Sequence, residues 1–233
     1  MVNKKRKHEE PSFDDMLNGL IADKVTASVV DVREERRYFL IVSEGVRTEP
    51  MYFEFLGSML PRYLVETVKV IGAGDNTVNV VKKAIALRDE RKKNVELPQF
   101  DEVWAVYDKD DFPDKHYNAA ISLAEKENIE SGHSNQSFEL WYILHFEFLQ
   151  SALHRDDYIK KLSSKLGVKY KKNNKAITKR IHTEGNVDKA IAWASQLEIL
   201  HKGNAAPDSC PYTRLYVLVD RLMAYIKNRK PQY

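Results

Sequence analysis

Four carboxylates, Glu44, Asp108, Asp110 and Asp111, follow short apolar runs whose residue types are typical of strands. So much negative charge in one cleft is unfavourable unless a cation neutralises it, and carboxylate oxygens are ligands of Mg²⁺ and Mn²⁺. We therefore expect these residues to hold Mg²⁺ or Mn²⁺. Such a site suits phosphodiester hydrolysis or transfer, with one carboxylate as the general base. The alternative is that they only cap helices and form solvated turns.

The spacing and the neighbours of the carboxylates add to this expectation. In an extended chain, residues two apart point to the same side, so Asp108 and Asp110 are predicted to face one ion. Gly45, directly after Glu44, is expected to allow close approach of a substrate to the backbone or an unusual dihedral. The segment "GAGDNT" lacks the lysine of a P-loop and the third glycine of a dinucleotide fingerprint, so it predicts a tight turn.

Strands and helices are predicted to alternate up to about residue 110. Runs of β-branched and aromatic residues predict strands at residues 38–43, 64–72 and 100–108. Apolar faces predict helices between them, the second behind a cap at Asp75. This alternation is typical of a parallel sheet with right-handed crossovers. Because ligands bind beyond the carboxyl ends of such strands, Glu44 and the three aspartates are expected on one rim.

The predicted fold is an α/β protein with an open, mainly parallel sheet flanked by helices and a helical C-terminal extension. Residues 1–35 are interpreted as a basic, charged arm, residues 36–150 as the core, and residues 151–233 as a helical region packed on it. In the core, "ESGHSNQS" is interpreted as a polar loop, followed by a helix that begins near Phe138. Broad apolar stripes predict two further helices, at residues 187–200 and 215–226.

Composition limits the class of protein. The 233 residues are 43% hydrophobic, and 37 Lys and Arg against 34 Asp and Glu give a charge of +3, which neither requires nor excludes nucleic acid. The one cysteine, Cys210, excludes an intrachain disulfide and a multi-cysteine metal site. No apolar stretch approaches the roughly 20 residues of a membrane helix, and the basic start lacks the apolar part of a secretory signal. We therefore expect a cytoplasmic protein.

A lysine-rich segment, "KLGVKYKKNNK", contains an aromatic residue, Tyr170, among its lysines. Two interpretations stay open: a solvated surface loop, and a patch that contacts the phosphates of a nucleic acid. In the second interpretation, the candidate nucleic-acid contacts are Lys169, Lys171, Lys172, Lys175 and Arg47.

Three blocks, "IVSEGVRTEPMYFEFL", "VWAVYDKDDF" and "SNQSFELWYILHF", resemble in this order the RloB-like family of prokaryotic antiphage and restriction-associated proteins. The core of that family is similar to a Toprim domain, the acidic fold of topoisomerases, primases and overcoming-lysogenization-defect nucleases. The resemblance covers residues 37–148. It implies a Toprim-like fold, with Glu44 as general base or acid, Asp108 and Asp110 as metal ligands, and Asp111 in an assisting role.

The third block of the family contributes a glutamate and a histidine, which are Glu139 and His145 here. Glu139 has two interpretations, a catalytic role and a favourable interaction of its charge with the helix dipole. His145 has apolar neighbours in the sequence, so it is predicted to be a hydrogen-bonded packing residue and not a ligand. Gln136 stands where the family usually has proline, a departure that is expected to alter only a turn.

The residues and the resemblance lead to the hypothesis of a Mg²⁺-dependent endonuclease in an antiphage, abortive-infection system. The resemblance implies RNA, with tRNA as one candidate, or DNA as the substrate, and an ATPase as the partner protein. A homo-oligomer stays open as well. The rival hypothesis is a docking or regulatory module that keeps the acidic cleft, performs no chemistry and binds the partner ATPase.

Overall fold

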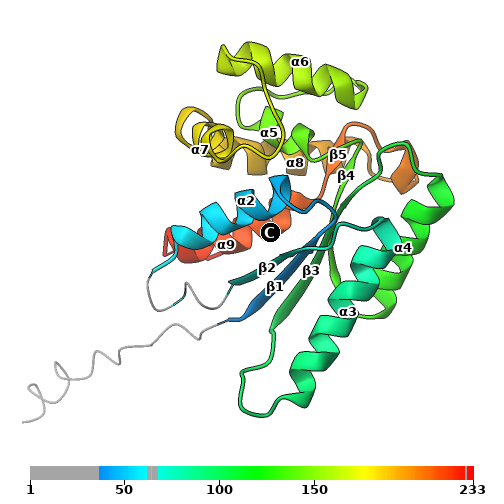
Figure 1. Ribbon diagram of the computed structural model, residues 1–233. Helices are drawn as coiled ribbons and strands as arrows, with labels where there is room; N and C mark the ends of the chain where they lie inside the picture. The colour runs from blue at the N-terminus through cyan, green and yellow to red at the C-terminus, as the bar shows by residue number, and fades with distance from the viewer. Residues whose placement is uncertain (1–36, 62–63, 65–67, 229) are drawn as a thin grey trace, which may run out of the picture. The chain divides into compact units, whose positions relative to one another are not determined.

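The computed structural model describes residues 37–61, 64, 68–228 and 230–233 (Figure 1). The described residues belong to one compact unit. The N-terminal arm predicted at residues 1–35 lies outside them. Within the described part of the chain, no helix combines the length and the apolar character that a membrane span requires.

A five-stranded sheet is the central layer of the described residues (Figure 1). The first four strands run parallel, the last is antiparallel to its neighbour, and the order across the sheet is β2-β1-β3-β4-β5. The predicted α/β class with a mainly parallel sheet is therefore confirmed, and β1 to β3 are the three predicted strands. The strands are β1 (Phe39–Ser43), β2 (Val68–Gly72), β3 (Glu102–Asp108), β4 (Glu130–Asn135) and β5 (Tyr212–Thr213).

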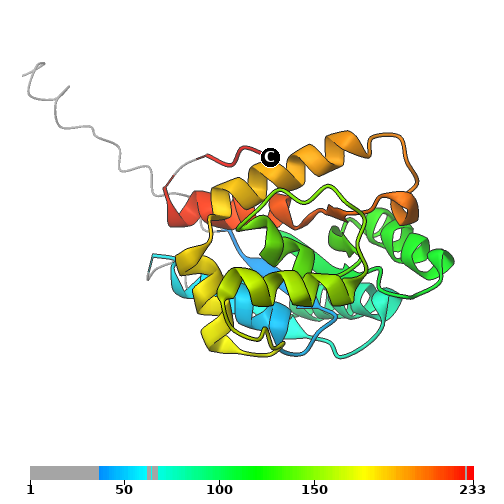
Figure 2. The same ribbon diagram turned by 90° about the horizontal axis from the view of Figure 1, so that it is seen from above.

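Helices cover both faces of the sheet. α3 and α4 lie on one face, and α2 and α9 lie on the other, with α5 to α8 beyond them (Figures 1 and 2). The helices predicted at residues 187–200 and 215–226 are α8 and α9. The helices are α2 (Thr48–Ser58), α3 (Thr77–Lys93), α4 (Asp114–Lys126), α5 (Glu139–Leu144), α6 (Arg155–Leu166), α7 (Lys175–Glu184), α8 (Val187–Leu200), the 3-10 helix η2 (Ala206–Asp208) and α9 (Leu215–Ile226).

The covering of both faces explains the continuous apolar runs in the sequence. In β1, Phe39 and Ile41 point into the core that α2 and α9 share. Leu40 and Val42 point into the core on the side of α3 and α4. All four expose 1% or less of their surface. A parallel strand buried in this way has a nearly unbroken hydrophobic sequence.

The interpretation of "ESGHSNQS" as a polar loop is wrong, because most of this segment forms the buried strand β4. Its polar side chains bond to one another and to neighbouring strands. Tyr107 OH and Ser131 Oγ are 2.6 Å apart, Ser131 Oγ and His133 Nδ1 are 2.8 Å apart, and Ser134 Oγ lies 2.9 Å from Thr213 Oγ1. Buried polar groups with partners avoid the cost of desolvation, so the strand needs few apolar residues.

The entry into α3 corrects a second expectation. Asn76, and not Asp75, is the residue that caps this helix, because its Oδ1 accepts a hydrogen bond from the N–H of Asn79 (3.3 Å). Asp75 supports the cap, since its Oδ1 accepts from the N–H of Asn76 (2.7 Å) and from Nδ2 of Asn79 (2.9 Å). Gly74, with φ of +63°, makes the expected tight turn before the cap.

The helices after residue 150 share one core with the sheet. Leu162 of α6, Ile181 of α7 and Leu197 of α8 are buried in the same hydrophobic cluster as Ile41 of β1 and Phe53 of α2. The chain then returns to the sheet through β5 and α9. The sequence analysis predicts α9 but not β5, which is only two residues long.

Candidate functional site

Glu44 lies at the carboxyl ends of β1 and β3, which are neighbours in the sheet. The N–H of Glu44, directly after β1, donates to the carbonyl of Val106 (2.8 Å). Its Oε2 in turn accepts from the N–H of Asp108 (3.0 Å). Two hydrogen bonds to β3 therefore hold this carboxylate at the edge of a parallel sheet where ligands characteristically bind.

Asp108, the last residue of β3, is buried, with 8% of its surface exposed. Its Oδ2 accepts a hydrogen bond from the N–H of Phe138 (3.0 Å), the residue just before α5. The aspartate thus joins the end of β3 to the start of α5. Glu44 and Asp108, both predicted from the sequence, are brought side by side.

The turn after β3 places Asp110 and Asp111 differently from the extended chain that the sequence predicts. β3 ends at Asp108 and Asp110 has φ of +41°, so the expectation of an extended chain between these two residues is wrong. That both carboxylates face one ion stays a prediction. The N–H of Asp110 donates to the carbonyl of Gln136 (2.9 Å). Arg155, at the start of α6, pairs with Asp110 (3.0 Å) and with Asp111 (2.8 Å), whose side chain is 64% exposed.

Glu49, in the first turn of α2, is a member of the site that the sequence analysis misses. It exposes only 9% of its surface, and its carboxylate lies against the backbone of Gly45. A Cβ on Gly45 would come within 2.0 Å of Glu49 Oε2, so the glycine is what admits this carboxylate. The available signal was the position of Glu49 five residues after Glu44, at the start of a helix that begins at the same rim.

Glu139 is buried beneath the connection between α6 and α7, with 1% of its surface exposed. Three donors surround its carboxylate: Ser137 Oγ (2.8 Å), Tyr170 OH (3.1 Å) and Lys172 Nζ (3.1 Å). All three protein donors converge on one carboxyl group, which fixes the rotamer of the side chain. Glu139 therefore lies near the other carboxylates, and its three donors hold its side chain in place.

His145 lies away from the carboxylates, in an aromatic cluster. It exposes 2% of its surface, its Nδ1 is bonded to the carbonyl of Trp141 (2.9 Å), and its Nε2 lies 3.4 Å from Tyr52 OH. Burial lowers the pKa of its imidazole to about 4. These are the properties of a neutral, hydrogen-bonded packing residue.

Mutual repulsion and burial disfavour the ionised carboxylates. Burial, followed by the charges of Asp110, Glu49 and Asp75, raises the pKa of Glu44 to about 7, against the hydrogen bond from Asp108 that lowers it. Burial, with the nearby charges of Glu139 and Asp110, also raises the pKa of Glu49 to about 7, although Lys172 opposes the shift. Burial and the surrounding carboxylates hold the pKa of Asp108 well above its usual range. The site therefore carries more carboxylates than its own cations neutralise.

The donor set suits a hard divalent ion, because every candidate ligand is a carboxylate oxygen and the site has fewer cations than carboxylates. The side chains do not converge as they stand: among the described residues, no group of three or more His, Cys, Asp or Glu side chains is arranged to hold a metal ion. Binding an ion would require Asp110 and Asp111 to exchange their pairing with Arg155 for the metal. The chemistry of the residues thus fits Mg²⁺ or Mn²⁺, and their positions call for a local rearrangement.

The lysine-rich segment lies beside the site, since it connects α6 to α7 and reaches the start of α2. Thr48 Oγ1 donates to Asn173 Oδ1 (2.9 Å) and accepts from the N–H of Asn173 (3.1 Å). Tyr170 is 3% exposed and donates to Glu139, so its ring offers no free face for stacking. Lys172 pairs with Glu139, and its side chain is 51% exposed. The other candidate nucleic-acid contacts are exposed; they are Arg47, Lys169, Lys171 and Lys175.

The fold and the site define a class: an α/β protein with a cluster of buried carboxylates at the carboxyl edge of a parallel sheet. The protein-family model described as "RloB-like protein" matches residues 39–222 of this sequence, which is most of the chain. The chain therefore belongs to the RloB-like family. No curated protein and no solved structure matches it.

Proposed function

We propose that this protein is a metal-dependent nuclease with a Toprim-like site that cleaves phosphodiester bonds in nucleic acid. The observation that carries the proposal is the gathering of Glu44, Glu49, Asp108 and Asp110 at one edge of the sheet, where burial and mutual repulsion raise the pKa of three of them. Clustered carboxylates repel one another, so a bound cation would stabilise them. Carboxyl groups with shifted pKa values also occur preferentially at functional sites.

Glu44 is the residue best suited to move a proton. Its pKa of about 7 leaves both protonation states populated near neutral pH, which is the condition for general acid or base catalysis. The N–H of Asp108 binds one of its oxygens and no donor among the described residues binds the other, so one oxygen is available to a substrate water or leaving group.

The metal would be held by Asp108, Asp110 and Glu44, with Asp111 assisting. When bound, Mg²⁺ or Mn²⁺ would neutralise charge on the phosphate and lower the pKa of a coordinated water. Asp108 is positioned for this role by its hydrogen bond from Phe138. Glu139 would act as a positioning residue, because Tyr170 and Lys172 already engage it.

Exposed cations beside the acidic site would hold the backbone of the nucleic acid. Lys169, Lys171, Lys175 and Arg47 supply four of them, on the connection between α6 and α7 and at the start of α2. Contacts between lysines and phosphates release counterions, so binding would weaken as salt increases. RNA, tRNA included, and DNA both fit this chemistry.

The cellular setting follows from the resemblance alone. We assign the protein to prokaryotic antiphage defence by abortive infection, acting in the cytoplasm under the control of a partner ATPase. Shared family and fold do not by themselves establish function, so the site chemistry and the setting need separate tests.

A second candidate is a catalytically silent docking module, and three ion pairs favour it. Arg155 neutralises Asp110 and Asp111, and Lys172 neutralises Glu139. With these pairs intact, the aspartates after β3 are engaged by protein and not by an ion. Such a protein would act by binding the partner ATPase.

The test is expression of the wild type and of Glu44→Gln and Asp108→Asn in a bacterial host, alone and with the product of the neighbouring gene. New RNA or DNA ends, mapped by sequencing, should appear with the wild type and disappear with both variants. Glu54→Gln is the matched control, because Glu54 is an exposed glutamate on α2. Purified wild type should lose cutting in EDTA and regain it with Mg²⁺.

Two outcomes would contradict the nuclease proposal. Intact nucleic acid under every condition, with the partner still bound, would support the docking module. Cutting that survives in EDTA would exclude a carboxylate-held metal as its cause, and cutting that survives in Glu44→Gln would exclude Glu44 as the group that moves the proton.

A further inference from the structure

A cavity lies away from the carboxylates. It is bounded by the C-terminal half of α8, by the segment that follows α8, and by the β4–β5 edge of the sheet. Its volume is about 440 Å³, within the range of roughly 300–1,000 Å³ that is typical of small-molecule sites. The floor is made by deeply buried residues and the rim by exposed ones. His133, Ser209, Tyr212 and Tyr216 expose 8% or less of their surface, whereas Ile199 exposes 68%.

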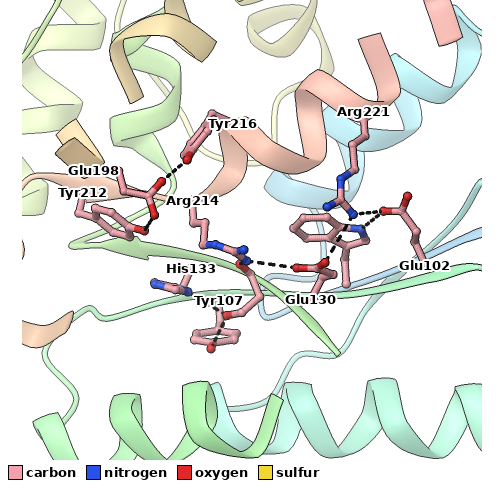
Figure 3. Close-up of polar contacts among 11 residues, drawn as sticks. Glu102, Tyr107, Glu130, His133, Glu198, Tyr212, Arg214, Tyr216 and Arg221 are labelled. Atoms are coloured by element: carbon pink, nitrogen blue, oxygen red, sulfur yellow. Dashed lines mark hydrogen bonds and ion pairs between the residues drawn. The ribbon is translucent and has the colours of Figure 1, made fainter. Parts of the chain in front are cut away.

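The two tyrosine rings are fixed as walls by one carboxylate. Glu198 accepts hydrogen bonds from the phenol groups of Tyr212 (3.4 Å) and Tyr216. Figure 3 shows both phenol groups turned toward Glu198. Both phenolic protons are therefore used inside the wall, and the rings present carbon surface. Tyr216 is also held by edge-to-face packing on Tyr233, with ring centroids 5.1 Å apart.

His133 supplies a free polar group to this cavity. Its Nδ1 is 2.8 Å from Ser131 Oγ, and Ser131 Oγ is 2.6 Å from Tyr107 OH (Figure 3). Its other nitrogen, Nε2, has no hydrogen-bond partner within the described part of the chain, although 94% of the residue's surface is buried, and His133 lines the cavity. An unpartnered polar atom at the floor of a cavity is a place for a ligand atom.

The chain of hydrogen bonds assigns a proton to that nitrogen. If Tyr107 donates to Ser131 and Ser131 donates to Nδ1 of His133, then every hydroxyl proton has an acceptor and the imidazole proton sits on Nε2. The reverse order would leave the proton of the buried Tyr107 hydroxyl without an acceptor, which is costly. Burial and the charge of Arg214 lower the pKa of His133 to about 3, so the ring is neutral and carries one N–H. His133 therefore presents a hydrogen-bond donor.

We infer that this cavity binds a single nucleotide, with the base against Tyr212 and Ile199, an acceptor atom of the base on His133 Nε2–H, and the phosphate on Lys202 at the rim. Small-molecule sites are typically lined by apolar and aromatic side chains with a few placed polar groups, and such a lining suits a planar base. A buried N–H selects a ring acceptor, and a lysine at the mouth attracts phosphate. The nucleotide can be a free mononucleotide or an unpaired nucleotide of a strand. The inference is independent of the nuclease proposal.

The test is titration of the full chain by isothermal calorimetry with AMP, GMP, CMP and UMP, with inorganic phosphate, and with a short single-stranded RNA. At least one monophosphate should bind with a stoichiometry of one and more tightly than phosphate. Lys202→Ala, at an exposed position, should weaken binding about tenfold, in line with the loss of a charge-assisted contact. Ile199→Asp, also at an exposed position, should weaken it as well, because it removes apolar surface and repels the phosphate. Lys126→Ala, at an exposed position in α4, is the matched control and should bind as the wild type does.

The polar contact has its own variants. His133→Leu should weaken nucleotide binding, and His133→Gln, which keeps an N–H donor, should restore part of it; thermal melts identify any variant that fails to fold. Stronger binding of the RNA than of monophosphates, lost in Ile199→Asp, would identify a strand as the source, and the opposite order a free nucleotide. Absence of monophosphate binding at millimolar concentration, equal binding of phosphate, or full binding by Ile199→Asp would overturn the inference.

Discussion

At the scale of single residues, the site depends on a few atoms whose environments differ sharply. Glu44 and Glu49 both have a pKa of about 7, but Glu44 accepts a backbone hydrogen bond from Asp108, whereas Glu49 lies against Gly45. Glu139 is bound by donors from its own turn and from the α6–α7 connection. Carboxylates in one small volume therefore have different environments, and this difference is the basis for proposing proton transfer by Glu44 and positioning by Glu139.

The raised pKa of Glu44 predicts a pH dependence of stability. The unfolded chain loses the Glu44 proton near 4.5 and the folded chain near 7, so this residue stabilises the fold below pH 4.5 and loses that contribution as pH rises to about 7. Glu44→Gln has no carboxyl group to titrate, so it should not show this loss. The free energy of unfolding of the variant minus that of the wild type should therefore be about 2 kcal/mol larger at pH 7.5 than at pH 4.5.

The measurement is urea unfolding of both proteins in EDTA at several pH values. Mg²⁺ at pH 7.5 should then stabilise the wild type and leave Asp108→Asn unchanged, since binding to the folded state alone shifts the equilibrium. A stability difference between wild type and Glu44→Gln that is the same at every pH would show that the carboxyl titrates normally.

At the scale of elements, the junction between β1 and α2 matters most. Gly45 comes two residues after β1 ends and leaves room for a carboxylate from the first turn of α2. A Glu at the start of a helix also interacts favourably with its dipole. The end of β1 and the start of α2 therefore fit together because position 45 is a glycine, which leaves room for the Glu49 carboxylate.

Gly45→Ala tests that match. A Cβ would lie 2.0 Å from Glu49 Oε2, so the Glu49 carboxylate must leave its place, at a cost of about 1–3 kcal/mol and with loss of any activity. Gly57→Ala, also in α2, is the control: no atom lies within 4 Å of its added Cβ, and alanine should stabilise the helix by about 0.5–1 kcal/mol. Thermal melts and nucleic-acid cleavage measure both; equal behaviour of the two variants would contradict the argument.

The connection between α6 and α7 is a second element with a defined anchor. Tyr170→Phe removes the hydrogen bond to Glu139, so it should cost about 1.5–3 kcal/mol and increase hydrogen exchange in the segment 167–174. Tyr117→Phe in α4 is the matched control, because the buried Tyr117 hydroxyl has no hydrogen-bond partner among the described residues. Equal stability of the two variants would show that the bond to Glu139 contributes little.

Elements with a local apolar pattern could be predicted from the sequence, and those without one could not. β1, β3, α8 and α9 have patterns that their burial creates. β4 is polar because its hydroxyl and imidazole groups pair across strands, which no local window can reveal. In the same way Glu44 and Asp108 could be placed at the rim, whereas the pairing of Arg155 with Asp110 joins residues 45 positions apart and required the structure.

At the scale of the whole described molecule, the sheet and the C-terminal helices are one folding unit. Leu162, Ile181 and Leu197 complete the core that Ile41 and Phe53 begin. The acidic site has the same composite origin, because the chain after residue 150 supplies Arg155 from α6 and Tyr170 and Lys172 from the connection between α6 and α7.

A chain of residues 37–150 should therefore fail to fold. It would expose the buried face of α2 and α5 and leave Glu139 without two of its donors, so we expect no cooperative thermal transition and a collapsed proton–nitrogen NMR spectrum. The chain of residues 37–233 is the control and should melt cooperatively. A sharp transition in the shorter chain would show that the sheet forms a domain by itself.

The polar strand β4 has a consequence for misfolding. If β4 slipped by one residue against β3, Ser131 would turn to the opposite side and lose its bond to Tyr107, and Ser134 would lose its bond to Thr213. Hydroxyl and imidazole groups stranded in a dry interior make every slipped pairing expensive. A strand of this composition also lacks the apolar, β-branched character of amyloid-forming segments. The centre of the sheet is thereby protected against mispairing and aggregation while the chain is still folding.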